Sequence, residues 1–283
     1  MNNPKEPLVV HDRQTLAQAE KNAGTVGLMV TRGNWHPGHQ AAFTEASGRV
    51  DTLVVSVYTD PVGSAFETTS DMISSADLQL AASSGVDIIF APSTEAFYPF
   101  GAAQTMLDPG LIIRQYEAAD HPEQSLNRLT QLVKMLGIVR PGKVFIGQCD
   151  AQLLAALRLV VRDLDIPVTV EAVPTFRDLD GLTVSQTIRA LSSSQREDAA
   201  VFAKALFAGV REAASSGSGE AVIAATREAL SGSDAEIEYL DLVDPISFES
   251  WQADGPSTAC LIAAVKLGEV RLSDNQLVVL SRP

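Results

Sequence analysis

Positive charge is scarce in this sequence: 21 Lys and Arg residues stand against 35 Asp and Glu residues, which leaves a formal net charge of −14. A surface that neutralises nucleic-acid phosphates needs clustered Lys and Arg, and the sequence contains no such cluster. Cysteine is scarce too, because Cys149 and Cys260 are the only two and lie far apart. Two distant cysteines do not make a disulfide framework, so we expect a reducing, cytoplasmic location.

Long apolar segments are also missing. The first seven residues lack the apolar core of a secretory signal, and the longest apolar stretches, 153–161 and 259–265, are too short or too interrupted to span a bilayer. We therefore expect a protein that binds neither membranes nor nucleic acids. What the sequence does have is 46% hydrophobic residues over 283 positions, enough for a substantial core and more than the usual length of one domain.

Short runs of β-branched and apolar residues alternate with segments of helical spacing in residues 1–181. Runs of this length are typical of buried strands, and their alternation with helices is typical of a parallel sheet. The predicted strands are 26–30, 52–58, 87–90, 143–146 and 167–170. The predicted helices are 40–47, 75–84, 125–136 and 152–164. We therefore predict an α/β fold with a Rossmann-like, doubly wound parallel sheet.

The pattern changes after the polar turn at 177–181. Two long helical patterns follow, separated by a Ser/Gly-rich linker, and three short apolar runs come after them. The expected helices are 194–214 and 220–230, and the expected strands are 236–243, 260–267 and 270–272. Residues 182–283 are accordingly predicted to form a small α+β C-terminal domain.

Two histidines follow the first predicted strand at once. His36-Pro37-Gly38-His39 precedes an apolar helical run, so its backbone amides should lie at a helix N-terminus, which is a natural anion site. Imidazoles there can donate hydrogen bonds to phosphoryl oxygens, and Gly33 and Gly38 let a nucleotide approach the backbone. The alternative is a Pro-Gly turn that merely carries two surface histidines. The chain has 4 His, and half of them fall where open α/β sheets bind ligands, which favours ATP binding with His36 and His39 as catalytic residues.

Several stretches resemble the motifs of one family. Residues 31–39 resemble the His-x-Gly-His signature of the adenylyl-transferring superfamily, and further similarity lies at 85–99, 139–150, 239–245 and 264–275. Together these stretches make the chain similar to the pantothenate synthetase (pantoate–β-alanine ligase) family. The resemblance implies the fold type of the HxGH nucleotidyltransferases and a homodimer. It also implies that ATP and magnesium are used to adenylate the carboxylate of pantoate, with release of pyrophosphate, before the amine of β-alanine attacks.

The same resemblance assigns site residues. His36 and His39 match the two histidines that the family places on ATP, and Glu117, Thr130 and Asp150 also fall on the family pattern. The expected ATP-binding residues are Arg32, Gly33, His36, Gly38, His39, Gly147, Asp150, Val184, Ser185 and Arg189. The expected substrate-binding residues are Asp60, Gly63, Gln152 and Leu153.

The sequence departs from the family pattern at positions that bind the phosphates of ATP and the carboxylate of pantoate. The family's phosphate-binding lysine is Cys149 here, and its two pantoate glutamines are Gly63 and Leu153. A charge-assisted hydrogen bond lost with the lysine is worth about 1.5–3 kcal/mol. Arg32 and Arg189 are candidate replacements for the lost positive charge. The altered acid pocket predicts weaker pantoate binding, or a bulkier, less polar or cationic substrate.

Three positions have two interpretations each, and a fourth is expected to be structural. Arg189 either belongs to a phosphate motif, since Ser185 and the residues after it resemble Ser-Ser-Thr-x-Ile-Arg, or is an exposed helix residue. Asp60 is either a counter-charge in the acid pocket or a turn residue before a proline. Asp77 is either a magnesium ligand or a helix-surface carboxylate. Cys149 is expected to fill space and not to be a reactive thiol.

Three functions are compatible with these residues. The first is an ATP-dependent acid–amine ligase that forms AMP and pyrophosphate, acting on pantoate and β-alanine or their analogues. The second is a nucleotidylyltransferase, or a ligase with a different acid substrate. The third is a nucleotide-binding paralogue without ligase activity. The two histidines and Asp150 favour catalysis, whereas Cys149, Gly63 and Leu153 favour an altered or lost activity.

Overall fold

The apolar runs in the first part of the chain pair as parallel strands. The structure, a computed structural model, describes residues 5–57, 73–101 and 103–281. Within these ranges six strands form one sheet in the order β1-β4-β3-β2-β5-β6, with every neighbouring pair parallel. They are β1 (Leu8–Val10), β2 (Val26–Thr31), β3 (Thr52–Val57), β4 (Ile88–Phe90), β5 (Lys143–Gly147) and β6 (Thr169–Val173). The α/β fold with a parallel sheet is confirmed.

The chain winds away from β2 in two directions. Helices α2 (Pro37–Ser47) and α3 (Ser75–Ser83) connect β2 to β3 and β3 to β4, and Phe43 of α2 packs with Met29 and its neighbours on that face of the sheet. The chain then returns to β5 through α6 (Pro122–Val139). Because parallel crossovers are right-handed, this reversed step places α6 on the other face. The strand order therefore switches between the neighbours β2 and β5, and open α/β sheets bind ligands beyond the carboxyl ends of such strands.

Some boundaries differ from the sequence prediction. Strand β1 was not predicted, since it has three residues and pairs only with β4 at the edge of the sheet. Helix α2 begins at Pro37 and not at residue 40, because proline is well suited to the first position of a helix. The remaining elements in this part of the chain are α1 (Arg13–Ala19), α4 (Thr94–Phe97) and α7 (Ala151–Asp163). No helix in the described ranges is long and apolar enough to cross a membrane.

A second, antiparallel sheet lies in the C-terminal part of the chain. Over the described residues it has three strands, in the order β7 (Glu236–Val243), β8 (Thr258–Leu267) and β9 (Val270–Val279). The central strand β8 is covered on both faces, with residues 259–265 all buried. Strand β9 continues well past the predicted range 270–272. The prediction ended too early because the polar residues from Ser273 to Gln276 interrupt the apolar alternation of the strand. The α+β character of this part is as predicted.

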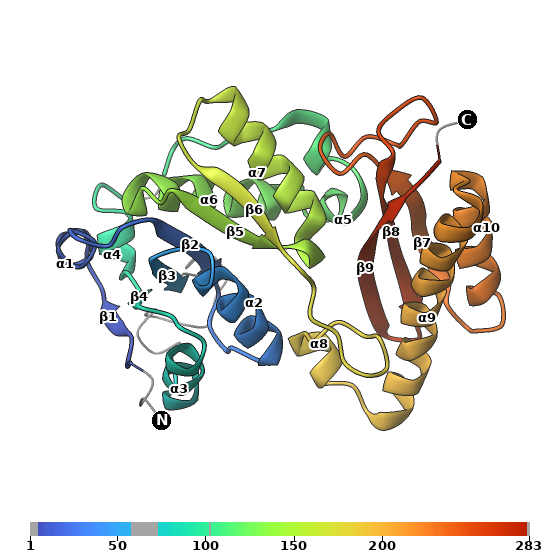
Figure 1. Cartoon of the computed structure of the whole chain (residues 1–283), viewed down its shortest axis with the longest axis horizontal. Helices are drawn as coiled ribbons and strands as arrows, with labels where there is room; N and C mark the ends of the chain where they lie inside the picture. Colours follow the sequence, from blue (N-terminus) through green and yellow to red (C-terminus); the bar gives the residue numbers. More distant parts are fainter. Residues whose placement is uncertain (1–4, 58–72, 102, 282–283) are drawn as a thin grey trace. The chain divides into compact units, whose positions relative to one another are not determined.

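Two long helices cover one face of this sheet. Helices α9 (Ser193–Ser216) and α10 (Gly219–Leu230) run side by side along the strands (Figure 1). A Cβ atom added at Gly209 of α9 would lie 2.3 Å from the Thr226 Oγ1 atom and 2.8 Å from the Leu261 Cδ2 atom. Only glycine therefore permits α9 to approach both α10 and the sheet this closely.

Contacts divide the chain into two compact units. The second unit takes in short elements that precede residue 177 in the sequence, namely η2 (Gly110–Ile113), α5 (Tyr116–Ala119) and η3 (Gln148–Asp150). The first unit comprises Met1–Asp108, Leu126–Gly147 and Val160–Phe176, and the second comprises Pro109–Ser125, Gln148–Leu159 and Arg177–Pro283. The division into domains 1–181 and 182–283 stays a prediction from the sequence pattern.

One buried carboxyl in the first unit makes stability depend on pH. Glu20 caps the carboxyl end of α1, and burial raises the pKa of its side chain to about 7. Its Oε1 atom is buried and lacks a hydrogen-bond partner among the described residues, and a helix C-terminus disfavours negative charge. The folded state therefore keeps the proton up to about pH 7, whereas the unfolded chain loses it near pH 4.5. The stability linked to this group is complete below pH 4.5 and declines as the pH rises to about 7.

We expect Glu20→Gln to relieve this loss. The neutral amide should raise the free energy of unfolding by about 1–2 kcal/mol at pH 8, after allowance for partial solvent screening, and by less than half as much at pH 5. Urea unfolding at the two pH values measures both quantities. An equal gain at pH 5 and pH 8 would show that the effect does not come from ionisation.

Candidate active site

The connection from β2 to α2 carries the two histidines. Strand β2 ends at the buried Thr31, and α2 begins at Pro37. Between them Gly33 (φ +79°) and Asn34 (φ +51°) both have left-handed backbone conformations. Glycine adopts this conformation freely, and asparagine does so more readily than most residues. Two such residues in succession turn the chain sharply within the short connection between the strand and the helix.

The histidine side chains cap this helix. His36 is the N-cap residue of α2, and its Nδ1 atom accepts a hydrogen bond from the Gly38 amide at 3.2 Å. The Nδ1 atom of His39 accepts from the His36 amide at 3.3 Å. The two rings lie 4.0 Å apart between centroids, tilted by 50°. Two of the amide groups that a helix N-terminus leaves without intrahelical partners are thereby satisfied by imidazole nitrogens.

These hydrogen bonds fix which nitrogen of each ring carries the proton. A nitrogen that accepts a hydrogen bond has no proton of its own, so each neutral imidazole is protonated at Nε2. His36 and His39 are both half-buried, which leaves part of each ring accessible. The result is a pair of Nε2–H donors at the positive end of an 11-residue helix. Such a pair is suited to stabilising negative charge that develops on phosphoryl oxygens.

A buried carboxylate holds the backbone just before the histidines. Asp77 is 5% exposed, and its Oδ1 atom accepts a hydrogen bond from the Trp35 amide at 2.7 Å. Its Oδ2 atom accepts from the Ser74 amide at 2.9 Å and from the Ser74 hydroxyl at 2.7 Å. The interpretation of Asp77 as a surface carboxylate is wrong, because its side chain is buried and ties the N-terminus of α3 to the histidine segment.

Trp35 is the second anchor of this segment, and sequence analysis did not identify it. Its Nε1–H group donates to the Thr31 Oγ1 atom at 2.9 Å, and that hydroxyl donates to the Ser56 carbonyl of β3 at 3.2 Å. The indole also meets Phe43 edge to face at 5.1 Å between centroids. A tryptophan directly before the first histidine was the available signal. These contacts hold the loop between β2 and α2 in one conformation.

A second group of expected residues follows β5. Gly147 ends this strand, which pairs directly with β2, so the two carboxyl ends lie at the same edge of the sheet. The turn η3 comes next, with Cys149 exposed and Asp150 half-buried. The carbonyl oxygens of Gln148 and Cys149 accept hydrogen bonds from the Asn275 side chain. The turn is thus held by a residue from β9 that sequence analysis did not single out.

The side-chain amide of Gln152 forms its hydrogen bonds with backbone groups of the protein. Its Nε2 atom donates to the Ile112 carbonyl at 2.6 Å and to the Gln115 carbonyl at 2.7 Å, and its Oε1 atom accepts from the Ala118 amide at 3.0 Å. Leu153, the next residue, is half-buried. Gln152 therefore braces the segment around α5, and a role in substrate binding stays a prediction.

Two residues on the family pattern also support the fold. Glu117 accepts hydrogen bonds from the Arg271 Nη1 atom at 2.9 Å and from the Tyr239 hydroxyl at 3.1 Å. Burial raises the pKa of Tyr239, which keeps this hydroxyl a donor. Thr130 accepts from the Leu107 amide at 2.9 Å through its Oγ1 atom. Both side chains join segments of the chain that are distant in sequence.

The residues expected around Ser185 form a short helix start. Ser185 is the N-cap of α8 (Gln186–Arg189), and its hydroxyl accepts from the Ile188 amide at 3.2 Å. Val184 is half-buried, and Arg189 is exposed at the end of this four-residue helix. An ATP-binding role for these three residues stays a prediction.

The expected site residues fall into three groups. Arg32, which is exposed, lies with Gly33, His36, Gly38 and His39 at the β2–α2 connection, next to the end of β5 at Gly147. The second compact unit contains Asp150, Gln152, Leu153, Val184, Ser185 and Arg189. Asp60 and Gly63 lie outside the described residues. Over the described ranges no group of three or more His, Cys, Asp or Glu side chains is arranged to hold a metal ion.

Comparisons with known proteins agree on one family. The family model for pantoate-beta-alanine ligase matches residues 9–277. The chain is 35% identical to a pantothenate synthetase of Thermobifida fusca over 284 residues, covering 96% of this chain and 95% of that protein. It superposes on the crystal structure of pantothenate synthetase from Thermus thermophilus with a TM-score of 0.82 and 30% identity, covering 95% and 98% of the two chains. The fold is also shared with the pantoate-beta-alanine ligase of Francisella tularensis complexed with beta-gamma ATP and beta-alanine (TM-score 0.71, 23% identity, covering 96% and 97%).

Proposed function

This chain belongs to the pantoate–β-alanine ligase family, and we propose that it uses ATP to join an acid to an amine, with pantoate and β-alanine as the substrates. The observation that carries the proposal is the pair of Nε2–H donors of His36 and His39 at the N-terminus of α2. The ligase of Francisella tularensis was crystallised with a nucleotide and with β-alanine, which are two of the proposed ligands.

The proposed reaction needs no protein nucleophile. A carboxylate oxygen of pantoate attacks the α-phosphorus of ATP, the bond to the β-phosphate oxygen breaks, and pyrophosphate leaves. The β-alanine nitrogen then attacks the acyl carbon, the bond to AMP breaks, and the amine loses a proton. Positioning and charge stabilisation supply the rate. His36 and His39 would donate to phosphoryl oxygens, while Asp77 and Trp35 hold their segment in place.

Magnesium would enter this reaction with ATP, where it neutralises phosphate charge. Mg²⁺ usually binds one or two carboxylates together with substrate phosphates. Asp77 does not fit this role, because both of its oxygens already accept hydrogen bonds from the protein. Asp150, a half-buried carboxylate in the turn after β5 that falls on the family pattern, is a second candidate.

The proposal extends to assembly and location. We place the protein in the cytoplasm as a homodimer, the assembly that the family resemblance implies. A reducing cytoplasm suits a chain whose two cysteines, Cys149 and Cys260, are not joined in a disulfide.

Pyrophosphate release tests the proposed reaction. With ATP, magnesium and pantoate alone we expect a burst of about one equivalent per site, because the acyl-adenylate stays bound until an amine arrives. Addition of β-alanine should convert the burst to steady turnover with formation of AMP. Absence of pyrophosphate with pantoate, together with no ATP-induced rise in melting temperature, would leave no support for the proposal.

Replacement of Cys149 sharpens this test. The family resemblance puts a phosphate-binding lysine at this exposed position, and a restored charge-assisted hydrogen bond is worth about 1.5–3 kcal/mol. Cys149→Lys is therefore expected to raise the rate of pyrophosphate release about tenfold or more, whereas the uncharged Cys149→Met is not. No gain in the lysine variant would indicate that the phosphates bind elsewhere.

A different acid substrate is the second candidate. Leu153 is a half-buried apolar side chain where the family places a pantoate-binding glutamine, which favours an acid with an apolar group at that point. The same pyrophosphate assay with a panel of small acids distinguishes the two. Faster release with an apolar acid than with pantoate would make that acid the substrate.

A further inference from the structure

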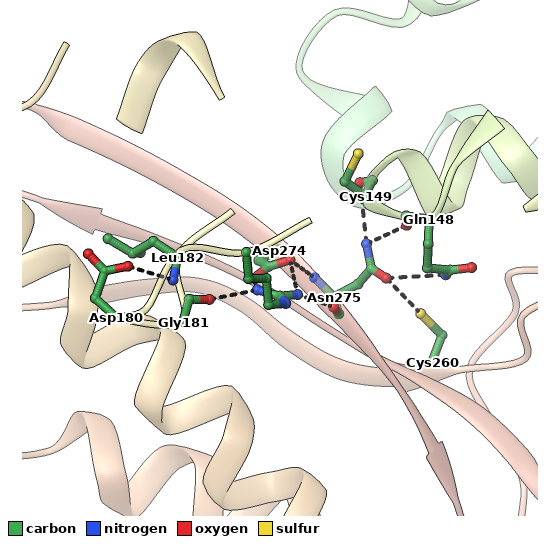
Figure 2. Close-up of polar contacts among 9 residues, drawn as sticks. Gln148, Cys149, Asp180, Gly181, Leu182, Cys260, Asp274 and Asn275 are labelled. Carbon is green, nitrogen blue, oxygen red and sulfur yellow. Dashed lines mark hydrogen bonds and ion pairs between the residues drawn. The ribbon is translucent and has the colours of Figure 1, made fainter. Parts of the chain in front are cut away.

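Asn275 of the last strand is bound to the turn that follows β5. Its side chain is buried (5% exposed), and its Nδ2 atom donates to the Gln148 carbonyl at 2.9 Å and to the Cys149 carbonyl at 3.3 Å (Figure 2). Its Oδ1 atom accepts from the Gln148 Nε2 atom at 3.2 Å and from the Cys260 thiol at 3.7 Å. Burial raises the pKa of Cys260 to about 12, so this thiol keeps its proton. Both the nitrogen and the oxygen of the Asn275 side-chain amide are therefore engaged in hydrogen bonds within the protein.

An ion pair fixes the backbone of Asn275 itself. The Asp274 Oδ1 atom accepts a hydrogen bond from the Asn275 amide at 2.8 Å, and the Arg177 Nη2 atom donates to the Asn275 carbonyl at 3.2 Å. Arg177 also binds the two Asp274 carboxylate oxygens, at 2.6 and 3.0 Å, and the Gly181 carbonyl at 3.0 Å. The two charged side chains are only 15% and 5% exposed. A fork of this kind holds one geometry more strictly than a single hydrogen bond does.

Holding the two carbonyls also orients two amides. A trans peptide unit is planar, so its carbonyl and the following N–H group point in opposite directions. When Asn275 binds the carbonyls of Gln148 and Cys149, the N–H groups of Cys149 and Asp150 are directed away from Asn275. Successive amides of a turn that leads into a helix are the groups that bind phosphates in proteins. Their direction, and the place of the Asp150 side chain, then depend on a residue of β9.

We infer that Asn275, held by Arg177 and Asp274, is a positioning residue that sets the Gln148–Asp150 turn for the phosphates of ATP. The inference rests on the proposed ATP-dependent reaction for its consequence and on the hydrogen bonds above for its geometry. Asn275 touches no substrate and acts only through the turn.

The test replaces Asn275 with leucine, which has a similar shape but makes no hydrogen bond. We expect the KM for ATP to rise at least fivefold while the KM for β-alanine stays within twofold. Loss of folded enzyme would lower kcat and change neither KM. Hydrogen exchange of the peptide covering residues 147–157 should accelerate in the same variant.

Val278→Ala is the matched control. Val278 is buried on the same strand, but it packs in the cluster under α9 and α10, on the opposite face from Asn275 because neighbouring strand positions alternate. It should weaken β9 without changing the KM for ATP or exchange at 147–157. Equal effects of the two variants on both readouts would overturn the positioning role.

The readouts separate this inference from the proposed function. Suppose that the wild type releases no pyrophosphate but that hydrogen exchange at 147–157 is faster in Asn275→Leu. This result would support the role of Asn275 in holding the turn and would refute the proposed reaction. An active wild type with unchanged exchange and unchanged KM for ATP in Asn275→Leu would refute the positioning role and leave the reaction intact.

Discussion

Replacement of His36 by asparagine is expected to lower kcat for pyrophosphate release by about 10²–10³-fold, the loss typical of removing one donor that stabilises transition-state charge. Asparagine is a favoured N-cap residue, and its Oδ1 atom can accept the Gly38 amide in place of the His36 Nδ1 atom. The variant therefore keeps the cap and loses the Nε2–H donor. Stopped-flow or coupled pyrophosphate assays measure the rate, and thermal unfolding measures the stability.

His36→Ala is the control that distinguishes the donor role of His36 from its capping role, since it removes both the donor and the cap. It should lose activity to a similar extent and, in addition, about 1 kcal/mol of stability. If His36→Asn retained full activity, His36 would be a capping residue alone and the catalytic assignment would fail.

Loss of the Arg177 side chain is expected to have the largest effect on stability. In Arg177→Met the Asp274 carboxylate remains buried without its partner, and breaking a buried ion pair in this way costs about 3–5 kcal/mol. Burial already raises the pKa of Asp274, and the Arg177 guanidinium opposes that rise, so its removal leaves the charge uncompensated. Guanidinium unfolding in a Trp35→Phe background reports on the second unit, because Trp251 is then the only tryptophan.

The double variant Arg177→Met with Asp274→Leu provides the comparison. It removes both charges, and replacing a buried ion pair by apolar residues is often neutral or stabilising. We expect it to be more stable than Arg177→Met alone, with strong non-additivity between the two sites. A double variant as unstable as the sum of the single ones would mean that the two side chains act independently.

Much of the fold could be predicted from the sequence because local patterns determine it. The runs around Leu53 and Val144 consist of the residues that favour buried strands, and each is flanked by a helical pattern. Strand β9 was truncated in the prediction because Asp274 and Asn275 interrupt its apolar alternation. These two residues bind Arg177 and the turn after β5, so the interruption marks their tertiary role and not the end of the strand.

The candidate site was predictable in part for the same reason. His36 and His39 form a local motif, and their position after a strand was sufficient to single them out. Asn275 lies 127 residues from Gln148 in the sequence, and no local pattern connects two residues so far apart. Gln152 was assigned to substrate by the family resemblance, and the structure shows its side-chain amide bound to backbone groups around α5, contacts that the sequence does not reveal.

The contact between Asn275 and Gln148 also has a consequence for synthesis on the ribosome. The two residues are separated by 127 positions, and translation at about 5–20 residues per second takes about 6–25 s to cover that distance. During this interval the turn after β5 has left the peptidyl-transferase centre, but the strand that holds it does not yet exist. Nascent chains therefore cannot complete the hydrogen bonds that hold the Gln148–Asp150 turn until the C-terminal sheet has formed.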